Sequence, residues 1–229
     1  MNKENNNQSV VDNLKRITAS LPQGVRLVAV SKYHPNEEIM ACLGAGHNVF
    51  GESREQELRS KYEALPKDIE WHFIGHLQTN KVKYIAPYIS CIHAVDSEKL
   101  LLEIEKQAAK NQRKISVLLQ LHVAQEETKY GFTKDELLDF FHKPLWRNLH
   151  YAKISGIMCM ASHTDDIERI RQDFRTAKDV FYTIKTNYFL DDETFCERSY
   201  GMSDDYHIAI EEGATLVRIG SSLFGESKY

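Results

Sequence analysis

The 229-residue chain lacks the features that mark membrane, secreted and nucleic-acid-binding proteins. It has no run of about eighteen apolar residues, the length that a transmembrane helix needs, so we expect no membrane partner. Residues 1–8 are polar and have no apolar core of a secretory signal, so we expect a disordered tail there and a cytoplasmic protein. Lys and Arg total 29 against 33 Asp and Glu, a net charge of −4, so we expect no nucleic-acid partner.

The four cysteines are also uninformative as a framework, because they are widely spaced and form no CxxC pair. This pattern fits buried thiols in a reducing cytosol better than a disulfide framework or a zinc site. His72 and His76 are four residues apart, but they fall across a strand and its following loop, and no third ligand is spaced with them. We therefore expect no metal site.

No proline- or glycine-rich segment divides the chain, so we expect one domain over residues 1–229. Eight short apolar runs alternate with helical patterns along its length, and such alternation predicts a parallel sheet. The expected strands are 25–31, 49–52, 69–75, 90–95, 114–123, 151–160, 197–202 and 214–219. The expected helices are 9–20, 35–43, 55–62, 80–85, 97–111, 134–142, 165–188 and 204–212.

Eight strands with no strand left over predict a closed (β/α)₈ TIM barrel. The alternative is an open doubly wound sheet, and the absence of GxGxxG after the first strand weakens its dinucleotide-binding form. In a barrel, active-site residues lie at the carboxyl ends of the strands, so the residues that follow each expected strand are the candidates for a site.

Lys32 ends the first apolar run, residues 25–31. A lysine in a partly dry pocket has a depressed pKa and can act as a general base or form a Schiff base with an aldehyde. The alternative is that Lys32 marks the point where the chain leaves the core and meets water. A further loop, Lys129-Tyr130-Gly131, is predicted either as a lid or as a simple turn.

The last two strand ends predict a phosphate site. Ser203 is expected as the N-cap of helix 204–212, and the small residues Gly220, Ser221 and Ser222 follow the eighth strand. Barrels often bind phosphate with the loops after strands seven and eight. Taken singly, these residues are better explained as a cap and a turn. Taken together, at the two positions where a barrel binds phosphate, they favour neither explanation over the other.

Arg218 lies inside the apolar run of the eighth strand. A buried guanidinium must meet an acceptor, which is either a ligand in the barrel mouth or a structural ion pair. A lysine, an arginine and a phosphate cup at one barrel mouth together suggest pyridoxal 5'-phosphate (PLP) as the cofactor.

Several segments then match one known family: Val28–Lys32, Phe50–Glu52, Trp71–Lys81, Glu127–Phe132, Gly156–Met158, Gly201–Asp205 and Val217–Ser221. On these motifs the chain resembles the pyridoxal phosphate homeostasis proteins over nearly all of its length. The resemblance implies a barrel like the N-terminal domain of alanine racemase (PLP fold type III). It also implies that PLP is held as an internal aldimine, without established catalysis, and that apo PLP-dependent enzymes are possible partners.

The resemblance assigns the cofactor contacts residue by residue. It implies the imine on Lys32 and Arg218 facing the pyridine nitrogen, which keeps that nitrogen unprotonated. It implies phosphate contacts from Ser203, Gly220 and Ser221, and it includes Met202 in the binding segment. The chain departs from the family pattern at Ser53-Arg54, where Asn-Tyr is usual, and at Ser221, where threonine is common.

The alternative function is a PLP-dependent, racemase-like amino-acid enzyme. Racemisation by two bases needs a second proton-transfer group, which racemases take from a partner subunit, and racemases carry a second, β-rich domain. The chain ends at Tyr229, so we expect neither, and we expect a monomer; Tyr33 and Tyr200 are the nearest candidates for an internal second base. A phosphate-binding barrel enzyme without PLP is a third hypothesis, but it leaves Lys32 unexplained.

Overall fold

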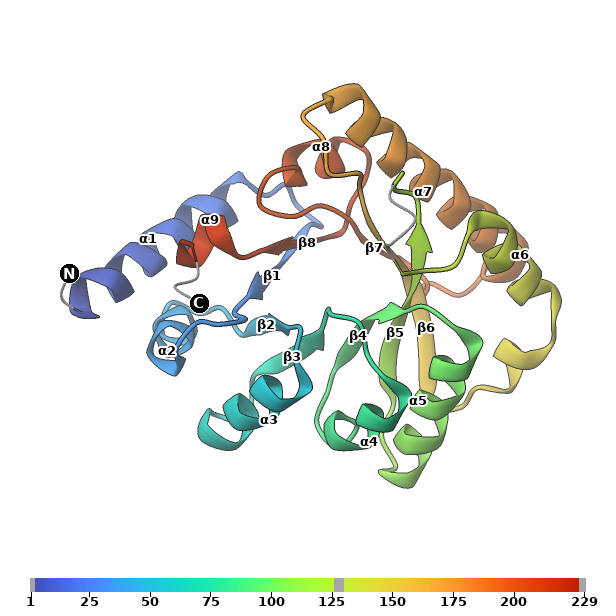
Figure 1. Cartoon of the computed structure of the whole chain (residues 1–229), viewed down its shortest axis with the longest axis horizontal. Helices are drawn as coiled ribbons and strands as arrows, with labels where there is room; N and C mark the ends of the chain where they lie inside the picture. The colour runs from blue at the N-terminus through green and yellow to red at the C-terminus, as the bar shows by residue number, and fades with distance from the viewer. Residues whose placement is uncertain (1–2, 126–129, 227–229) are drawn as a thin grey trace.

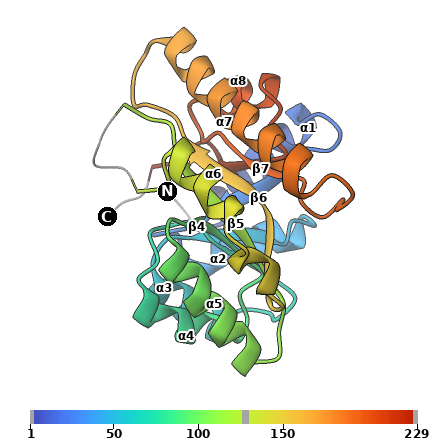
Figure 2. The same cartoon turned by 90° about the vertical axis from the view of Figure 1, so that its right-hand side faces the viewer.

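The computed structural model describes residues 3–125 and 130–226, and their eight strands form one closed parallel barrel in chain order. Helices surround the barrel on the outside (Figures 1 and 2). The strands are β1 Arg26–Val30, β2 Val49–Glu52, β3 Glu70–Phe73, β4 Cys91–Val95, β5 Ile115–His122, β6 Ala152–Met160, β7 Glu197–Ser199 and β8 Leu216–Ile219. All eight overlap the expected ranges, and the predicted (β/α)₈ barrel is confirmed.

The helices alternate with the strands along the chain, with one long helix ahead of the first strand and one short helix after the last. They are α1 Lys3–Ser20, α2 Asn36–Gly44, α3 Glu55–Ala64, α4 Val82–Ile85, α5 Glu98–Lys110, α6 Lys134–His142, α7 Ile167–Tyr188, α8 Tyr206–Glu211 and α9 Ser221–Phe224. Two 3₁₀ turns, Thr79–Lys81 and Leu145–Asn148, complete the described elements. The last helix and the second turn were not expected from the sequence, because each is a single turn and too short to show a helical period.

The expected disordered tail is wrong over residues 3–8, because α1 already begins at Lys3. Its apolar face consists of Val10, Leu14 and Ile17, which are buried. Ahead of that face, the Asn6 side chain donates a hydrogen bond to Glu38 Oε1 at 2.5 Å. The polar start of α1 is therefore held by α2, a tertiary contact that the local sequence does not reveal.

The barrel interior is filled by side chains and by one close backbone approach. Val28, Leu118, Met158 and Leu216 pack together inside the ring of strands. On β6, Gly156 has a φ of +159°, and a Cβ there would lie 1.8 Å from the carbonyl oxygen of Glu197 on β7. Only glycine permits this spacing, so Gly156 sets how closely β6 and β7 approach.

The barrel closes where the first and last strands pair. Arg26 of β1 is the register partner of Leu216 of β8, and Ala29 is the partner of Ile219. The helices next to this seam, α1 and α9, also lie side by side (Figure 1), and the Asn13 side chain donates to the carbonyl oxygen of Leu223 at 3.1 Å. Residues from the two ends of the chain therefore build one side of the barrel together.

The described cysteines are free thiols, as expected, but they are not all buried. Cys42, Cys91 and Cys159 are buried, whereas Cys196 is exposed just ahead of β7. Within residues 3–125 and 130–226, no helix combines the length and the apolar character that a membrane crossing requires.

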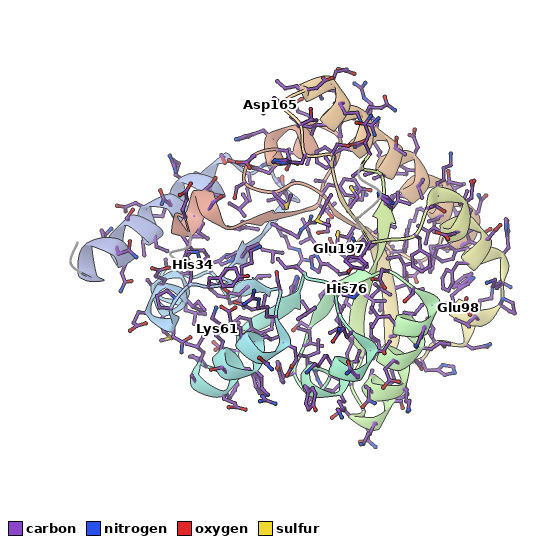
Figure 3. The ribbon with its side chains drawn as sticks, viewed as in Figure 1. His34, Lys61, His76, Glu98, Asp165 and Glu197 are labelled. Carbon is purple, nitrogen blue, oxygen red and sulfur yellow. The ribbon has the colours of Figure 1, made fainter. Side chains whose placement is uncertain are left out.

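A buried lysine ties the end of β1 to β2 and α3. Lys61 of α3 points toward the β1–β2 side of the barrel (Figure 3), and its Nζ donates to the carbonyl oxygen of Ser31 at 2.7 Å and to Glu52 Oε1 at 2.8 Å. Ser31 Oγ donates to the same Glu52 oxygen at 2.7 Å, and Lys61 also pairs with Glu57 at 2.7 Å. Burial raises the pKa of Glu52 to about 7, against the opposing effect of Lys61.

We predict that Lys61→Met destabilises the fold by about 3 kcal/mol at pH 8, because it leaves Glu52 as an uncompensated buried charge. The raised pKa of Glu52 makes its contribution favourable at low pH and unfavourable as pH rises through about 7, so the deficit of the variant shrinks at pH 5. Chemical denaturation at both pH values measures the effect.

Two further variants control this experiment. The double variant Glu52→Gln/Lys61→Met should recover most of the lost stability, because neither member of the buried pair carries a charge any longer. Lys106→Met removes an exposed pair with Glu103 (3.9 Å) and should change the free energy of unfolding by less than ~1 kcal/mol. Equal effects of Lys61→Met and Lys106→Met at pH 8 would contradict the prediction.

Candidate functional site

A cavity of about 500 Å³ opens at the carboxyl ends of the strands, where a barrel keeps its active site. All six residues that the sequence predicts as cofactor contacts line it: Lys32, Met202, Ser203, Arg218, Gly220 and Ser221. They come from the segments that follow β1 and β7 and from β8 and its end, so barrel closure brings them together. Their role as cofactor contacts stays a prediction.

Lys32 does not continue the first strand, because β1 ends at Val30 and Lys32 lies in a turn. Its side chain is exposed at the cavity rather than enclosed. The next residue, Tyr33, has a φ of +68°, a left-handed conformation that is strained for a bulky residue, and its amide donates to Glu57 Oε1 at 2.6 Å. The anchored residues on both sides, Ser31 and Tyr33, fix the backbone from which the Lys32 amine extends.

Arg218 is almost completely buried, and it is held by neutral acceptors. Its Nη1 donates to the carbonyl oxygen of Ser199 at 2.6 Å and to Ser199 Oγ at 2.7 Å, and its Nη2 donates to the carbonyl oxygen of Cys159 at 3.0 Å. Among the described residues, no carboxylate forms an ion pair with it, so the expected alternative of a structural ion pair is wrong. These bonds use three of the five guanidinium N–H donors, which leaves donors for a ligand in the cavity.

Ser203 serves a different helix from the one predicted. It is not the N-cap of α8, which begins at Tyr206 after Asp205. Its Oγ instead accepts from the amides of Gly220 (3.2 Å) and Ser222 (3.4 Å) at the start of α9. Because the oxygen accepts both bonds, the hydroxyl hydrogen is free to donate to an anion in the cavity.

The backbone around Ser203 is shaped by two glycines and an aspartate. Gly201 has a φ of +85°, and a Cβ there would lie 2.6 Å from Ala209 Cβ. The amide of Met202 donates to Asp205 Oδ1 at 2.6 Å, which closes the turn and leaves the Met202 side chain exposed at the cavity. At Gly220, an added Cβ would lie 3.2 Å from the carbonyl oxygen of Val30, so β8 passes close to β1 below Lys32.

Further residues line the cavity that sequence reasoning did not single out. Gln120 of β5 has the same signal as Arg218, a polar residue inside an apolar strand, and its side chain donates to the carbonyl oxygen of Tyr130 at 2.8 Å. Tyr130 stacks on His76 with ring centroids 4.0 Å apart, and His76 lies 3.0 Å from Asp96 Oδ2. The predicted lid-or-turn segment thus reaches the cavity through Tyr130, while Lys129 and the motif residues 127–128 lie outside the described residues.

The departure at Ser53-Arg54 affects the cavity through Ser53. Ser53 lines the cavity, whereas the guanidinium of Arg54 lies 4.8 Å from the centroid of the Tyr33 ring and lines a neighbouring depression. Arg54 therefore packs over the turn that carries Lys32, and it places its charge beside the cavity rather than inside it.

The two tyrosines considered as internal bases differ in position. Tyr33 lines the cavity. Tyr200 is completely buried and stacks on Phe174 of α7, outside the ring of strands, and burial raises its pKa well above the usual value. Tyr200 is therefore excluded as a proton-transfer group in this cavity.

Below the cavity, the barrel interior holds two histidines in contact. His72 of β3 and His93 of β4 are both buried, and their Nδ1 and Nε2 atoms lie 2.9 Å apart. The thiol of Cys91 completes a group whose ligand atoms lie within 4.8 Å of one another. The sequence pairs His72 with His76, but the fold pairs it with His93 instead. The facing nitrogens of His72 and His93 share a hydrogen bond. The absence of a metal stays a prediction.

Comparison with known protein families covers almost the whole chain. The family model of the alanine racemase N-terminal domain matches residues 6–228. A pyridoxal phosphate homeostasis protein of Aquifex aeolicus is 42% identical over 205 residues, which are 89% of this chain and 88% of that protein. A protein of the same name from Helicobacter pylori is 38% identical over 204 residues, 88% of each chain.

Solved structures extend the comparison to the fold. PipY of Synechococcus elongatus, solved with PLP bound, is 30% identical with a TM-score of 0.85, over 94% of this chain and 100% of that chain. An alanine racemase from E. faecalis shares the fold, with a TM-score of 0.74 at 17% identity, and the match covers 97% of this chain but 59% of the racemase. The match to the family model and the sequence identity to these relatives lead to one conclusion: the chain belongs to the pyridoxal phosphate homeostasis protein family, within the alanine racemase N-terminal-domain fold.

Proposed function

We propose that this chain binds pyridoxal 5'-phosphate in the cavity at the barrel mouth and acts in the homeostasis of that cofactor. The observation that carries the proposal is the convergence of Lys32, Arg218 and the Ser203–Gly220–Ser221 segment on one cavity of about 500 Å³. Its support from relatives is the PLP-bound structure of PipY, which is 30% identical.

The residues present fit the chemical groups of the cofactor. Lys32 offers an exposed primary amine on an anchored backbone, and such an amine condenses with an aldehyde to a Schiff base with loss of water. The hydroxyl hydrogen of Ser203 and the small residues Gly220 and Ser221 suit a phosphate. Arg218, buried and held by three neutral acceptors, suits an uncharged ring nitrogen, because a fixed cation beside that nitrogen disfavours its protonation.

An unprotonated ring nitrogen also bears on catalysis. A pyridine ring without a proton is a weak electron sink, and PLP enzymes depend on that sink to stabilise a carbanion. The proposed placement of Arg218 therefore favours holding the cofactor over using it. We accordingly propose a non-enzymatic carrier in the cytoplasm whose partners are apo PLP-dependent enzymes.

Incubation with PLP is expected to give a yellow protein with an imine absorption band, which borohydride removes while it fixes the cofactor on Lys32. Lys32→Ala is expected to abolish the band and to keep weaker binding that inorganic phosphate competes away, because the Ser203–Gly220–Ser221 segment is intact. Absorption spectra, peptide mapping of the reduced protein and competition titration measure these effects.

The matched control is Lys15→Ala, which removes an exposed lysine from α1, outside the lining of the cavity. This variant should keep the wild-type absorption band. The proposal is contradicted if the wild-type protein stays colourless after incubation with PLP. It is also contradicted if the reduced cofactor is found on any lysine other than Lys32.

The racemase-like alternative can be tested at one residue, because Tyr33, a candidate second base, lines the cavity. We expect no exchange of the Cα hydrogen of alanine with D₂O at a rate competent for turnover, since the proposed state of the ring disfavours the carbanion. Proton NMR of alanine incubated with the PLP-loaded protein measures the exchange. If the wild-type protein exchanges this hydrogen rapidly and Tyr33→Phe does not, the carrier proposal is overturned in favour of a racemase-like enzyme.

We also propose that the chain is a monomer in solution. The exposed large apolar side chains are spread over several helices rather than gathered on one, with Met40 on α2, Tyr84 on α4, Leu102 on α5 and Ile167 and Tyr182 on α7. An obligate dimer would expose a continuous apolar face in the single chain. Light scattering is expected to give the monomer mass of 26.5 kDa, and a stable dimer mass contradicts the proposal.

A further inference from the structure

Arg218 presents an electrostatic problem that its direct contacts do not solve. Its charged guanidinium is almost completely buried, and all three of its described acceptors are neutral. A buried charge without a counter-charge is costly. Asp205 acts on the guanidinium through space and favours its charged form, but among the described residues no carboxylate forms an ion pair with it. The carboxylate that hydrogen bonds link to Arg218 is Glu70, at the opposite end of the barrel.

The chain of hydrogen bonds runs through four contacts inside the barrel. Arg218 Nη1 meets Ser199 Oγ at 2.7 Å, and Ser199 Oγ meets His93 Nδ1 at 2.9 Å. His93 Nε2 meets His72 Nδ1 at 2.9 Å, and His72 Nε2 meets Glu70 Oε1 at 2.9 Å. The three intermediate side chains are each at most 2% exposed, whereas the side chain of Glu70 is 37% exposed at the start of β3.

The direction of every bond follows from the arginine. A guanidinium has donors and no acceptor, so Ser199 Oγ must accept from Arg218. The described contacts of Ser199 Oγ leave His93 Nδ1 as the acceptor for its hydroxyl hydrogen. His93 then carries its proton on Nε2 and donates to His72 Nδ1.

The remaining bond follows in the same way, because His72 must carry its proton on Nε2 and donate to Glu70. Each donor points away from the cavity and toward the carboxylate. The environment agrees with this arrangement, because burial, with His72, Arg218 and Arg26 nearby, lowers the pKa of His93 and keeps its ring neutral. The hydrogen bond from His72 lowers the pKa of Glu70 and keeps it a carboxylate, and Arg26, with Nη1 3.9 Å from Glu70 Oε1, acts in the same direction.

We propose that Ser199, His93 and His72 are positioning residues that link Arg218 to Glu70 as its distant counter-charge. Hydrogen bonds in a chain polarise one another, so the carboxylate stabilises the guanidinium through three neutral groups. A guanidinium does not release a proton in proteins, so the chain cannot conduct protons to the cavity, and its role is to hold and compensate Arg218. Because no carboxylate in the described part of the chain forms an ion pair with Arg218, its remaining donors stay available to a ligand in the cavity.

The consequence for the ligand rests on the proposed function, in which Arg218 faces the ring nitrogen of PLP. Breaking the chain at His93 leaves the Ser199 hydroxyl without its acceptor and cuts the link from Arg218 to Glu70. The contact of Arg218 with the ring nitrogen should then weaken. That change would appear in the absorption of the bound cofactor and in its affinity.

The first test uses the protein without cofactor and does not depend on PLP binding. Long-range ¹H–¹⁵N NMR spectra of the histidine side chains distinguish a protonated ring nitrogen from an unprotonated one. We expect both His72 and His93 to be neutral with the proton on Nε2. In Ser199→Ala, which removes the hydroxyl that points at His93 Nδ1, the signal of that nitrogen should shift while His72 keeps its tautomer. A wild-type His93 with a protonated Nδ1 overturns the chain, whatever the protein does with PLP.

The second test uses the PLP-loaded protein. His93→Phe removes both hydrogen bonds of the ring, and we expect about tenfold weaker PLP binding, the effect of losing one hydrogen bond to a charged group. The pH midpoint of the imine absorption band should shift as well. His93→Gln keeps one acceptor and one donor group in the side chain, and it should lie closer to wild type in both measurements.

The matched control is His47→Phe, which also removes a largely buried imidazole and its hydrogen bond, here to the carbonyl oxygen of Val49. It should leave the affinity and the spectrum unchanged. If His93→Phe behaves like His47→Phe while wild type binds PLP, the positioning role is overturned. If wild type fails to bind PLP but shows the expected tautomers, the proposed function fails and the hydrogen-bond chain stands.

Discussion

The pairing of β8 with β1 is the interaction on which the site depends. The register that joins Ala29 to Ile219 places the turn after β1 beside the segment that follows β8. Gly220 makes the approach possible, because a Cβ there would press on the carbonyl oxygen of Val30 at 3.2 Å. Lys32 and the Ser203–Gly220–Ser221 segment, which are far apart in the sequence, meet in one cavity for this reason.

The two buried cations near this seam are compensated in different ways. Lys61 Nζ donates directly to Glu52 at 2.8 Å and to the carbonyl oxygen of Ser31. Its charge is therefore paired inside the protein, where it supports the turn that carries Lys32. Arg218 meets no carboxylate among the described residues and is held by carbonyl and hydroxyl oxygens. One cation is therefore part of the scaffold, and the other keeps donors for the cavity.

Much of the fold could be predicted from the sequence, because the evidence for it is local. The strands are short apolar runs between helical patterns, and α6 begins with a local signal, the capping box of Thr133 and Glu136. The start of α1 could not be predicted, because Asn6 is held by Glu38, which lies 32 residues further along the chain. A polar run shows no helical period, and the contact that orders it is tertiary.

The same distinction between local and tertiary evidence separates the parts of the site that were predicted from those that were not. Lys32, Arg218 and the residues after β7 and β8 were predicted because a polar residue in or after a buried strand is unusual. The predicted role of Ser203 as the N-cap of the helix that follows it was wrong, because its partners are the amides of Gly220 and Ser222 at the start of α9. The contact between His72 and His93 was missed because it joins neighbouring strands through a register that no local pattern reports.

The contact between α1 and α9 has a consequence for how the protein is made. Asn13 leaves the ribosome before its partner Leu223, which follows 210 residues later in the chain. The β1–β8 seam joins the same two segments, so neither contact can form before β8 has been synthesised. Until then the nascent chain has an open sheet edge and an incomplete cavity. A chain that can hold a ligand in this cavity is therefore one whose eighth strand has already been made.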